Sequence, residues 1–436
     1  MLDIFQLLTR VTKIVLRNKK KTMERITSID KNSFINYAEK YGTPLYVYDA
    51  DLIVERYKEL YKYITWPKLK ILYAMKANYN IGILNLLKNN NAYLDTVSPS
   101  EIHLALKLGF LKEDILFTAN NITDEEMHEI KKTGVLFNIG SLSRLQKYGA
   151  AYPGSKVCIR FNPDVYAGEH KHVQTAGAIT KFGILLSEVN SVKEIIKKCN
   201  IKVVGLHEHT GSGIGETDKV YESMTNLLKI ATQENFPDLQ FIDFGGGFKI
   251  PYKATTKRID YASFGDKISS IFSDFCKRYG RDLYMYFEPG KYIVAESGYL
   301  LIEVNTLKNN RGRLIAGTNS GFNHLIRPLL YGSHHQIENI SNPNGELKIY
   351  DVCGNICETG DCFAEQRELT EIREGDKLII KNAGAYCYSM GSIYNLRSMP
   401  SELLVADGKE FIITKRLSNE ELAESIISSA NEVIRF

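Results

Sequence analysis

The stretch YLDTVSPSEIHLALKLGFLKEDILFTA, residues 93–119, places two strand-like runs on either side of one helix-length segment. The runs YLDTV (93–97) and ILFTA (115–119) are rich in aromatic and β-branched residues, as buried strands are. The segment between them, SEIHLALKLG (100–109), has the apolar spacing of an amphipathic helix. Strand, helix and strand in this order predict one parallel β-α-β unit.

The same alternation continues on both sides of this unit, so that eight strand-like runs lie between Ile71 and Glu288. Amphipathic segments such as SVKEIIKKCN (191–200) and DKVYESMTNLLKIATQ (218–233) separate them. Eight successive units predict the α/β class and a closed, parallel (β/α)8 barrel of the TIM type, with an open doubly wound sheet as the alternative. The other six runs are ILYAM (71–75), VLFNI (135–139), VCIRF (157–161), KVVGLH (202–207), FIDF (241–244) and LYMYFE (283–288).

The pattern changes after the eighth run, where short strands follow one another with turn residues between them. Runs such as YLLIEVNTLKNN (299–310) and ELLVADGKEFIITKR (402–416) predict an all-β C-terminal domain of sandwich-like or barrel-like form. The tail SNEELAESIISSANEVIRF (418–436) is a candidate terminal helix, and the run TPLYVYD (43–49) is strand-like.

These patterns divide the chain into four parts. We expect residues 51–298 to form the barrel and residues 299–436 to form the β domain with its terminal helix. Residues 25–50 are expected to join the β domain, and residues 1–24 to be a disordered extension. The extension is mildly amphipathic with a basic end, so a surface-associating helix is the alternative.

Composition excludes several classes of protein. Apolar residues make up 44% and charged residues 24% of the 436 residues, as in soluble globular proteins. A net charge of +4, without a long basic run, argues against nucleic-acid binding, and no run of about 18 apolar residues predicts a membrane span. The seven cysteines, from Cys158 to Cys387, favour reduced thiols and a cytoplasmic location over a disulfide framework.

Functional groups of such barrels gather at the C-terminal ends of the strands. The first strand ends at Lys76, which is either a solvated charge or an amine in an apolar pocket, where a lowered pKa allows a Schiff base. The sixth strand ends in His207-Glu208-His209, which could bind a metal or pack one imidazole on a flat cofactor ring. The metal interpretation lacks an evident third ligand nearby, and Ser212 in Gly-Ser-Gly could donate to a phosphate.

The last two strand ends are rich in glycine. Gly245-Gly246-Gly247 permits a close backbone approach to an anion, and Glu288-Pro289-Gly290-Lys291 adds a cation. Phosphate sites commonly form in the loops after the seventh and eighth strands of such barrels. Together the two loops predict a phosphate site more strongly than either does alone.

Two motifs of the β domain carry candidate reactive groups. Cys353, Cys357 and Cys362 lie close together in sequence, but their spacing is irregular for a zinc site. We therefore interpret Cys357-Glu358 with Asp361 as a polar active-site cluster. Tyr386 follows small residues at the end of a strand and is either a core aromatic or a phenol that faces substrate.

Taken together, these motifs resemble the family of fold-type III pyridoxal-phosphate decarboxylases, in which the barrel has the form of alanine racemase. The resemblance extends from about Tyr46 to Leu404. Within that family the chain is most similar to the members that act on meso-2,6-diaminopimelate. The motifs occur in the family's order and read YAMKAN, LDTVSPSE, KFGI, GLHEHTGSG, DFGGGF, FEPGK, IRPLLY, CETGD and GAYCYSM.

The resemblance implies a function and a set of site residues. The chain would be a lyase that uses pyridoxal 5'-phosphate to release carbon dioxide and L-lysine, as a homodimer whose active sites lie at the subunit interface. Lys76 and Cys357 would be catalytic, with Lys76 holding the cofactor and Cys357 returning a proton. The implied cofactor residues are Lys76, Asp95, Glu101, Arg160, His209, Ser212, Gly245, Gly246, Gly247, Glu288, Pro289, Gly290, Lys291 and Tyr386, and the implied substrate residues are Lys291, Arg327, Tyr331, Glu358 and Tyr386.

The residue types suit a substrate with two groups at its far end. Arg327 can bind a distal carboxylate through two parallel hydrogen bonds, and Glu358 can pair with a distal ammonium. Lys291 departs from the family's usual arginine, which replaces a bidentate group by a point charge. The stretch AGTNSGFNH (316–324) also lacks an aspartate that is common there.

Three alternatives remain open from the sequence. The first is a decarboxylase of the same fold that acts on ornithine, arginine or carboxynorspermidine. The ornithine type usually has aspartate after the cysteine, where this chain has Glu358. A non-catalytic relative would typically lack Lys76 or Cys357, and both are present. A racemase would need a second base on the opposite face of the cofactor ring.

Overall fold

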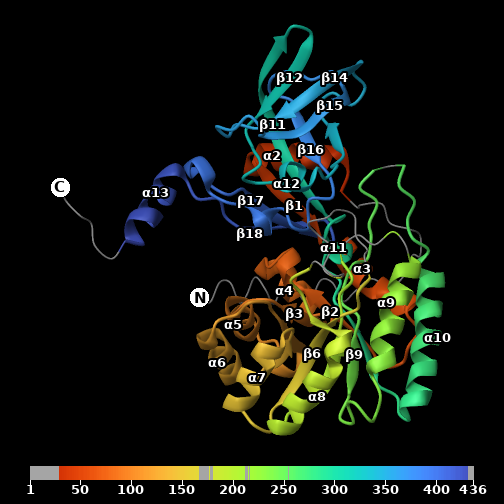
Figure 1. The fold of residues 1–436 in the computed structure, drawn as a ribbon. Coiled ribbons are helices and arrows are strands. Elements are labelled where there is room, and N and C mark those ends of the chain that lie inside the picture. Colours follow the sequence, from red (N-terminus) through yellow and green to blue (C-terminus); the bar gives the residue numbers. More distant parts are fainter. Residues whose placement is uncertain are drawn as a thin grey trace.

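The computed structural model describes residues 29–165, 176, 180–211, 215, 217–253 and 255–430. The predictions for the extension at 1–24 and for Ser212 therefore lie outside the described residues. Figure 1 shows the barrel in orange to green below and a second, mainly blue-green body of strands above it.

Eight parallel strands form the closed sheet of the barrel. Their order is β5-β4-β3-β2-β10-β9-β8-β6, and the pairing of β5 with β6 closes the ring. This closure confirms the predicted barrel and rules out the open doubly wound sheet. Each strand overlaps one predicted run: β2 (Leu69–Ala74), β3 (Tyr93–Thr96), β4 (Ile115–Thr118), β5 (Leu136–Ile139), β6 (Lys156–Asn162), β8 (Lys202–His207), β9 (Phe241–Asp243) and β10 (Tyr284–Phe287).

Helices cover the outside of the ring (Figure 1). The three amphipathic segments quoted above are helical, as predicted, and α5 shows how such a helix begins. The Ser98 hydroxyl accepts the backbone N–H of Glu101, and Pro99 occupies the first turn, where its missing N–H costs no hydrogen bond. The outer helices are α3 (Ala50–Tyr63), α4 (Ile81–Lys88), α5 (Pro99–Lys107), α6 (Asp124–Thr133), α7 (Leu142–Ala151), α8 (Val189–Lys198), α9 (Thr217–Ile230) and α10 (Tyr261–Tyr279).

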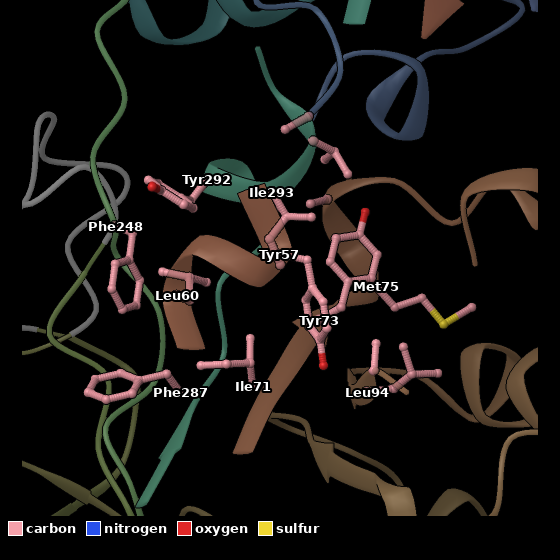
Figure 2. Close-up of a cluster of buried hydrophobic side chains, with 14 of the residues drawn as sticks. Tyr57, Leu60, Ile71, Tyr73, Met75, Leu94, Phe248, Phe287, Tyr292 and Ile293 are labelled. Carbon is pink, nitrogen blue, oxygen red and sulfur yellow. The ribbon is translucent and has the colours of Figure 1, made fainter. Parts of the chain in front are cut away.

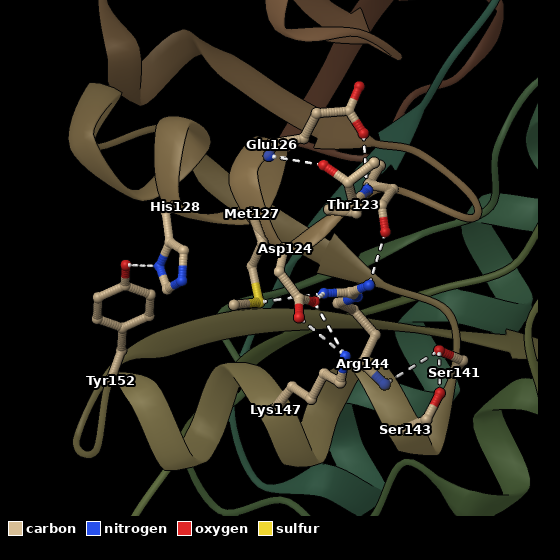
Figure 3. Close-up of polar contacts among 11 residues, drawn as sticks. Thr123, Asp124, Glu126, Met127, His128, Ser141, Ser143, Arg144, Lys147 and Tyr152 are labelled. Atoms are coloured by element: carbon tan, nitrogen blue, oxygen red, sulfur yellow. Dashed lines mark hydrogen bonds and ion pairs between the residues drawn. The ribbon is translucent and has the colours of Figure 1, made fainter.

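Polar contacts on the outer surface fix neighbouring helices against each other, as Figure 3 shows for α6 and α7. Thr123 and Glu126 form a reciprocal capping box at the start of α6. Asp124, in the first turn, accepts from Arg144 and Lys147 of α7. An acidic group at this end also complements the partial positive charge of the helix N-terminus.

A buried cluster between α3, β2 and β10 supports the first strand end (Figure 2). Tyr57, Tyr73 and Tyr292 are almost completely buried within it. Their hydroxyls remain hydrogen-bonded, since Tyr73 donates to the Asn78 carbonyl at 2.9 Å and Tyr292 to Glu59 at 3.0 Å. The cluster therefore holds rigidly the short turn η1 (Met75–Ala77), which carries Lys76.

The second sheet contains β1 together with the C-terminal strands. β1 pairs antiparallel with β11 and parallel with β17, so the segment before the barrel completes the later sheet. The helix α2 (Lys31–Tyr41) packs Phe34 and Tyr37 on its face. The strands are β1 (Leu45–Asp49), β11 (Gly298–Asn310), β12 (Arg313–Thr318), β13 (Ile337–Asn339), β14 (Leu347–Cys353), β15 (Cys362–Thr370), β16 (Lys377–Ile380), β17 (Ser401–Ala406) and β18 (Lys409–Thr414).

Three short elements complete the chain: β7 (Ile184–Leu185), α11 (Lys291–Val294) and α12 (Arg327–Tyr331). The predicted terminal helix is present as α13 (Asn419–Ser428). No helix among the described residues combines the length and the apolar character needed to cross a bilayer.

A buried histidine at the junction of the two bodies predicts a pH-dependent stability. His335 has no exposed surface, donates from Nδ1 to the Lys381 carbonyl at 2.9 Å and packs edge-on against Tyr252. Burial and the Arg327 charge lower the pKa of His335 to about 3. At a pH between this pKa and the ordinary pKa of histidine, the imidazole is protonated in the unfolded chain but not in the folded protein. The free energy of unfolding should therefore fall as the pH falls, by up to about 1.4 kcal/mol per pH unit from this residue.

Urea titrations at pH 7, 6 and 5 on the native chain and on His335→Gln measure this contribution. The variant should be less stable at pH 7, and the difference between the two free energies should shrink towards pH 5. A difference that stays constant over this range would contradict the assignment.

Candidate active site

Lys76 lies at the mouth of the barrel, where β2 passes into η1. The turn is tied on both sides, because the Ala74 N–H donates to the Pro289 carbonyl and the Tyr386 N–H donates to the Ala77 carbonyl. The Lys76 ammonium contacts the Asp95 carboxylate at the end of β3. The Lys76 side chain is still 37% exposed, but its ion pair with Asp95 distinguishes it from a lone solvated charge.

The electrostatic environment of Lys76 also differs from the expectation. Burial alone would lower the pKa of Lys76, as the sequence argument assumed, but the negative charge of Asp95 outweighs it and raises the pKa above its ordinary value. Burial raises the pKa of Asp95 in turn to about 7. The amine is thus held as an ion pair whose acidic partner takes up a proton near neutral pH.

Glu101 lies in the first turn of α5, behind this pair. Its Oε2 accepts the Val97 N–H at 2.7 Å, and burial raises the pKa of Glu101 to about 7. Arg160 lies near the C-terminal end of β6, with its guanidinium 4.7 Å from the Phe182 ring centroid. Its Nη2 is buried and has no hydrogen-bond partner among the described residues.

Glu288 follows β10 and is 6% exposed. Its carboxylate accepts from His207 Nε2 at 3.1 Å and from the Thr118 hydroxyl at 3.5 Å. The potential ligand atoms of His207, Asp243 and Glu288 all lie within 4.8 Å of one another. In the described part of the chain, this is the only such group of three potential metal ligands. The sequence interpretation that His207 lacks a nearby carboxylate is therefore wrong, because β9 and β10 bring two.

Charge is distributed unequally in this group. Burial, together with the Glu288 charge, raises the pKa of Asp243 well above its ordinary value. Burial also raises the pKa of Glu288, although the positive Lys76 and Arg160 oppose the shift. The larger upward shift makes Asp243 the more readily protonated of the two, and the cations favour the negative charge on Glu288.

The two glycine-rich loops pack closely against each other and against His209. A Cβ on Gly246 would stand 2.5 Å from the Glu288 carbonyl oxygen, and a Cβ on Gly245 would stand 2.5 Å from His209 Nδ1. The Gly246 N–H instead donates to His209 Nδ1 at 3.0 Å. This bond fixes the neutral tautomer of His209, whose pKa burial lowers well below the ordinary value.

A cavity of about 310 Å³ brings the predicted residues together. A small adjoining cavity reaches the two glycine loops and is lined by Gly246, Gly247, Pro289 and Gly290. Eight residues predicted from the sequence line the larger one: Lys76, Arg160, His209, Glu288, Lys291, Arg327, Tyr331 and Tyr386.

Two cationic side chains lie in the wall of this cavity. Lys291 and Arg327 are 7% and 5% exposed, and both line the cavity. The Arg327 guanidinium lies 5.3 Å from the Tyr252 ring centroid and 5.6 Å from that of Tyr331. Its Nη2 donates to the Ser333 hydroxyl at 3.3 Å, and its Nε has no partner among the described residues. A buried cation with unused donors suits an anionic ligand.

Cys357 and Glu358 lie elsewhere, in the turn between β14 and β15. Both are exposed, and neither lines the 310 Å³ cavity of its own chain. Asp361 does not join them as a reactive group. It is 4% exposed and accepts the backbone N–H groups of Phe322 and Ile356, so it organises the turn that presents them.

Comparisons with known proteins identify the family. The family model described as pyridoxal-dependent decarboxylase, pyridoxal binding domain, matches residues 50–295. The diaminopimelate decarboxylase of Methanothermobacter thermautotrophicus is 40% identical over 397 residues, which cover 89% of this chain and 92% of that protein. The chain belongs to the diaminopimelate decarboxylase family.

Other members agree with this assignment. The diaminopimelate decarboxylase of Escherichia coli K12 is 30% identical over 91% of this chain and 96% of its own length. The crystal structure of diaminopimelate decarboxylase from Helicobacter pylori, complexed with L-lysine, is 30% identical with a TM-score of 0.83, and covers 91% of this chain and 100% of that one. The predicted family and the barrel with its β domain are thus confirmed.

The sequence did not reveal the roles of two residues of this site. His207 was considered as a metal ligand but not as the hydrogen-bond donor to Glu288, and Asp243 was read only as part of a strand. Both lie on strands whose side chains alternate between the barrel interior and the helices. Only the three-dimensional register reveals that both point inward beside Glu288.

Proposed function

We propose that this chain is a carboxy-lyase that uses pyridoxal 5'-phosphate to convert meso-2,6-diaminopimelate into L-lysine and carbon dioxide. The observation that carries the proposal is one cavity lined by an amine, an anion and a cation, namely Lys76, Glu288 and Arg327. The cofactor supplies an aromatic ring that accepts the electron pair left when the carboxylate departs.

The described residues fit this cofactor. The small cavity lined by Gly246, Gly247 and Gly290 would receive its phosphate. Arg160, whose buried Nη2 has no partner among the described residues, lines the adjoining larger cavity. His209 would lie against one face of the ring, and Glu288 would meet the ring nitrogen. Lys76 would bind the cofactor carbonyl through Nζ, with Asp95 and Glu101 supporting it.

Proton transfer at Lys76 follows from its pairing with Asp95. An amine attacks a carbonyl only after it loses a proton, and the Asp95 carboxylate is in direct contact with the Lys76 ammonium and can accept it. The neutral His209 adds no competing charge on the face of the ring. Glu288, as an anion, would stabilise a positive charge on the ring nitrogen by charge pairing.

Arg327 is proposed to select the substrate by binding its distal carboxylate, with Lys291, Tyr331 and Tyr386 beside it. Arg327→Met should lower kcat/KM for diaminopimelate by roughly 10- to 200-fold, because a charge-assisted hydrogen bond contributes about 1.5–3 kcal/mol. Steady-state assays of carbon dioxide release measure the effect. Arg327→Lys keeps the charge without the bidentate geometry, so its kcat/KM should lie between those of the native protein and Arg327→Met.

The same assay separates the specificities that the sequence left open. Ornithine has no distal carboxylate, so the proposal expects the native protein to prefer diaminopimelate and Arg327→Met to lose most of that preference. Greater turnover of ornithine or arginine than of diaminopimelate by the native protein would reject the proposed substrate.

We also propose a cytoplasmic homodimer in which the Cys357-Glu358 turn of one subunit completes the cavity of the other. Exposed apolar residues near that turn support it, because Leu329 and Tyr394 are 47% and 44% exposed. A Cβ on Gly360 would stand 3.0 Å from Leu329, and the Tyr394 hydroxyl donates to Glu358 at 2.9 Å. Burying this face in a partner would remove apolar surface from water and bring the thiol to substrate.

Mixing two inactive variants tests the shared site. Lys76→Ala and Cys357→Ala should each be nearly inactive as homodimers. After unfolding and refolding together, half of the dimers should be mixed, and each should contain one intact site, which predicts about a quarter of native activity. Activity that stays at the level of the separate variants would show that both residues serve the same subunit's site.

A further inference from the structure

Two cysteines face each other at the base of the β14–β15 hairpin. Cys353 and Cys362 are cross-strand partners, and their sulfur atoms are 3.3 Å apart. One step towards the turn, the Gly354 N–H donates to the Asp361 carbonyl at 2.9 Å. Because hydrogen-bonded and non-hydrogen-bonded pairs alternate along an antiparallel ladder, the two cysteines occupy the non-hydrogen-bonded position, where side chains are closest.

The pair differs from the buried cysteines of the chain. Cys353 and Cys362 are both partly exposed, whereas Cys158, Cys276 and Cys387 are buried. Cys362 also lines a cleft of about 800 Å³ that continues to Arg327. Small reagents in that cleft can therefore approach the pair, and Cys353 is itself partly exposed.

The local chemistry favours a nucleophilic thiolate at Cys353. A hydrogen bond from Cys362 lowers the pKa of Cys353, whereas the same contact raises the pKa of Cys362. The thiolate is the form that attacks a disulfide, so Cys353 is suited to react first.

We propose that Cys353 and Cys362 form a reversible disulfide that closes the base of the hairpin loop at 354–361. This loop carries Cys357 and Glu358. The bond itself does not depend on the proposed function, whereas its importance for catalysis rests on that function. The separation and the cross-strand position require little movement of the backbone.

The oxidant is a low-molecular-weight disulfide. The Cys353 thiolate attacks one of its sulfurs, forms a mixed disulfide and releases the first small thiol. Cys362 then loses its proton to solvent, attacks the Cys353 sulfur and displaces the second small thiol. Two electrons pass from the protein to the small disulfide, which leaves as two thiols, and a dithiol reverses both steps.

Closing this base restricts the loop that presents the catalytic thiol. In the reduced chain the loop is held by hydrogen bonds, chiefly those that Asp361 accepts from Phe322 and Ile356. A covalent bond at the base of the loop opposes the local unfolding motion in which those hydrogen bonds break together. We therefore expect the oxidised loop to open less often, with Cys357 remaining a free thiol.

Peptide mapping of the cofactor-bound, full-length protein tests bond formation. The protein is incubated with oxidised glutathione or with dithiothreitol, alkylated and cleaved before aspartate, which separates residues 351–360 from residues 361–375. Oxidised native protein and Cys357→Ser should both yield these two peptides joined by a disulfide. Cys353→Ser and Cys362→Ser should not.

The mapping has two outcomes that would overturn the proposal. One is a cross-link through Cys357 in place of Cys353, which fragmentation of the joined peptides distinguishes. The other is full alkylation of all three cysteines after oxidation. Neither depends on decarboxylation, so failure of the proposed function would leave this result unaffected.

Hydrogen exchange tests the effect on the loop. The amides of Gly354 and Ile356 should exchange several-fold more slowly in the oxidised native protein than in the reduced one. The double variant Cys353→Ser/Cys362→Ser should show no difference between the two conditions. If the disulfide forms and the exchange rates of these amides do not change, the proposed restriction of the loop is wrong.

Discussion

Replacing Lys76 by alanine should abolish the visible absorption band of the cofactor-bound protein and lower kcat by about 10⁴-fold or more. The residue supplies the only amine that contacts Asp95 among the described residues, and it lines the cavity next to His209 and Glu288. Without it, the cavity loses the amine that is paired with Asp95, and Lys291 is the remaining lysine among the described residues that line it. Absorption spectra and carbon dioxide release on cofactor-supplemented protein measure both effects.

The fold should survive this change. Removal of Lys76 leaves Asp95 buried, but the pKa of Asp95 is already raised to about 7, so the carboxyl can take up a proton instead of remaining an unpaired anion. Lys76→Arg is the matched control, because it keeps a cation beside Asp95 but cannot form the Schiff base. An absorption band or near-native activity in either variant would remove Lys76 from its proposed role.

Replacing Glu288 by glutamine should lower kcat by roughly 10²- to 10³-fold while the absorption band of bound cofactor remains, at a shifted wavelength. Glutamine fits the same space and can still accept the hydrogen bond from His207. It cannot supply the negative charge that holds a proton on the ring nitrogen. Loss of kcat without loss of cofactor would separate this electrostatic role from binding.

Thr118→Val is the control for Glu288→Gln. It removes only the long hydrogen bond of 3.5 Å to the carboxylate and leaves the charge in place, so less than a tenfold loss is expected. If Glu288→Gln retained activity within tenfold of the native protein, the charge at this position would be unnecessary for the reaction.

The barrel was predictable from the sequence because its signal is local and repeated. Each buried parallel strand forms a short run of apolar and β-branched residues, and each helix that follows shows amphipathic spacing. The strands β13 and β15 carry weaker signals, since the exposed face of an antiparallel sheet mixes polar residues into each run. They were absent from the runs quoted in the sequence analysis.

The candidate site was predictable to the extent that strand ends mark function. Lys76, His209, the glycine triplet and Glu288 each follow a recognisable run, and one cavity contains them. The pKa of Lys76 was not predictable, because its sign depends on the Asp95 carboxylate from the neighbouring strand. The separation of Cys357 from the cavity of its own chain was likewise invisible in sequence order.

The amino-acid sequence by itself thus determined the order of the strands and helices, the residue types at each strand end and the resemblance to one family. Only the tertiary structure decided that His207 and Asp243 flank Glu288, that Asp95 pairs with Lys76 and that Cys353 faces Cys362. The physical reason is distance. Local patterns reflect neighbours within a few residues, whereas charge pairing and thiol proximity arise between strands that only the closed barrel and the hairpin bring together.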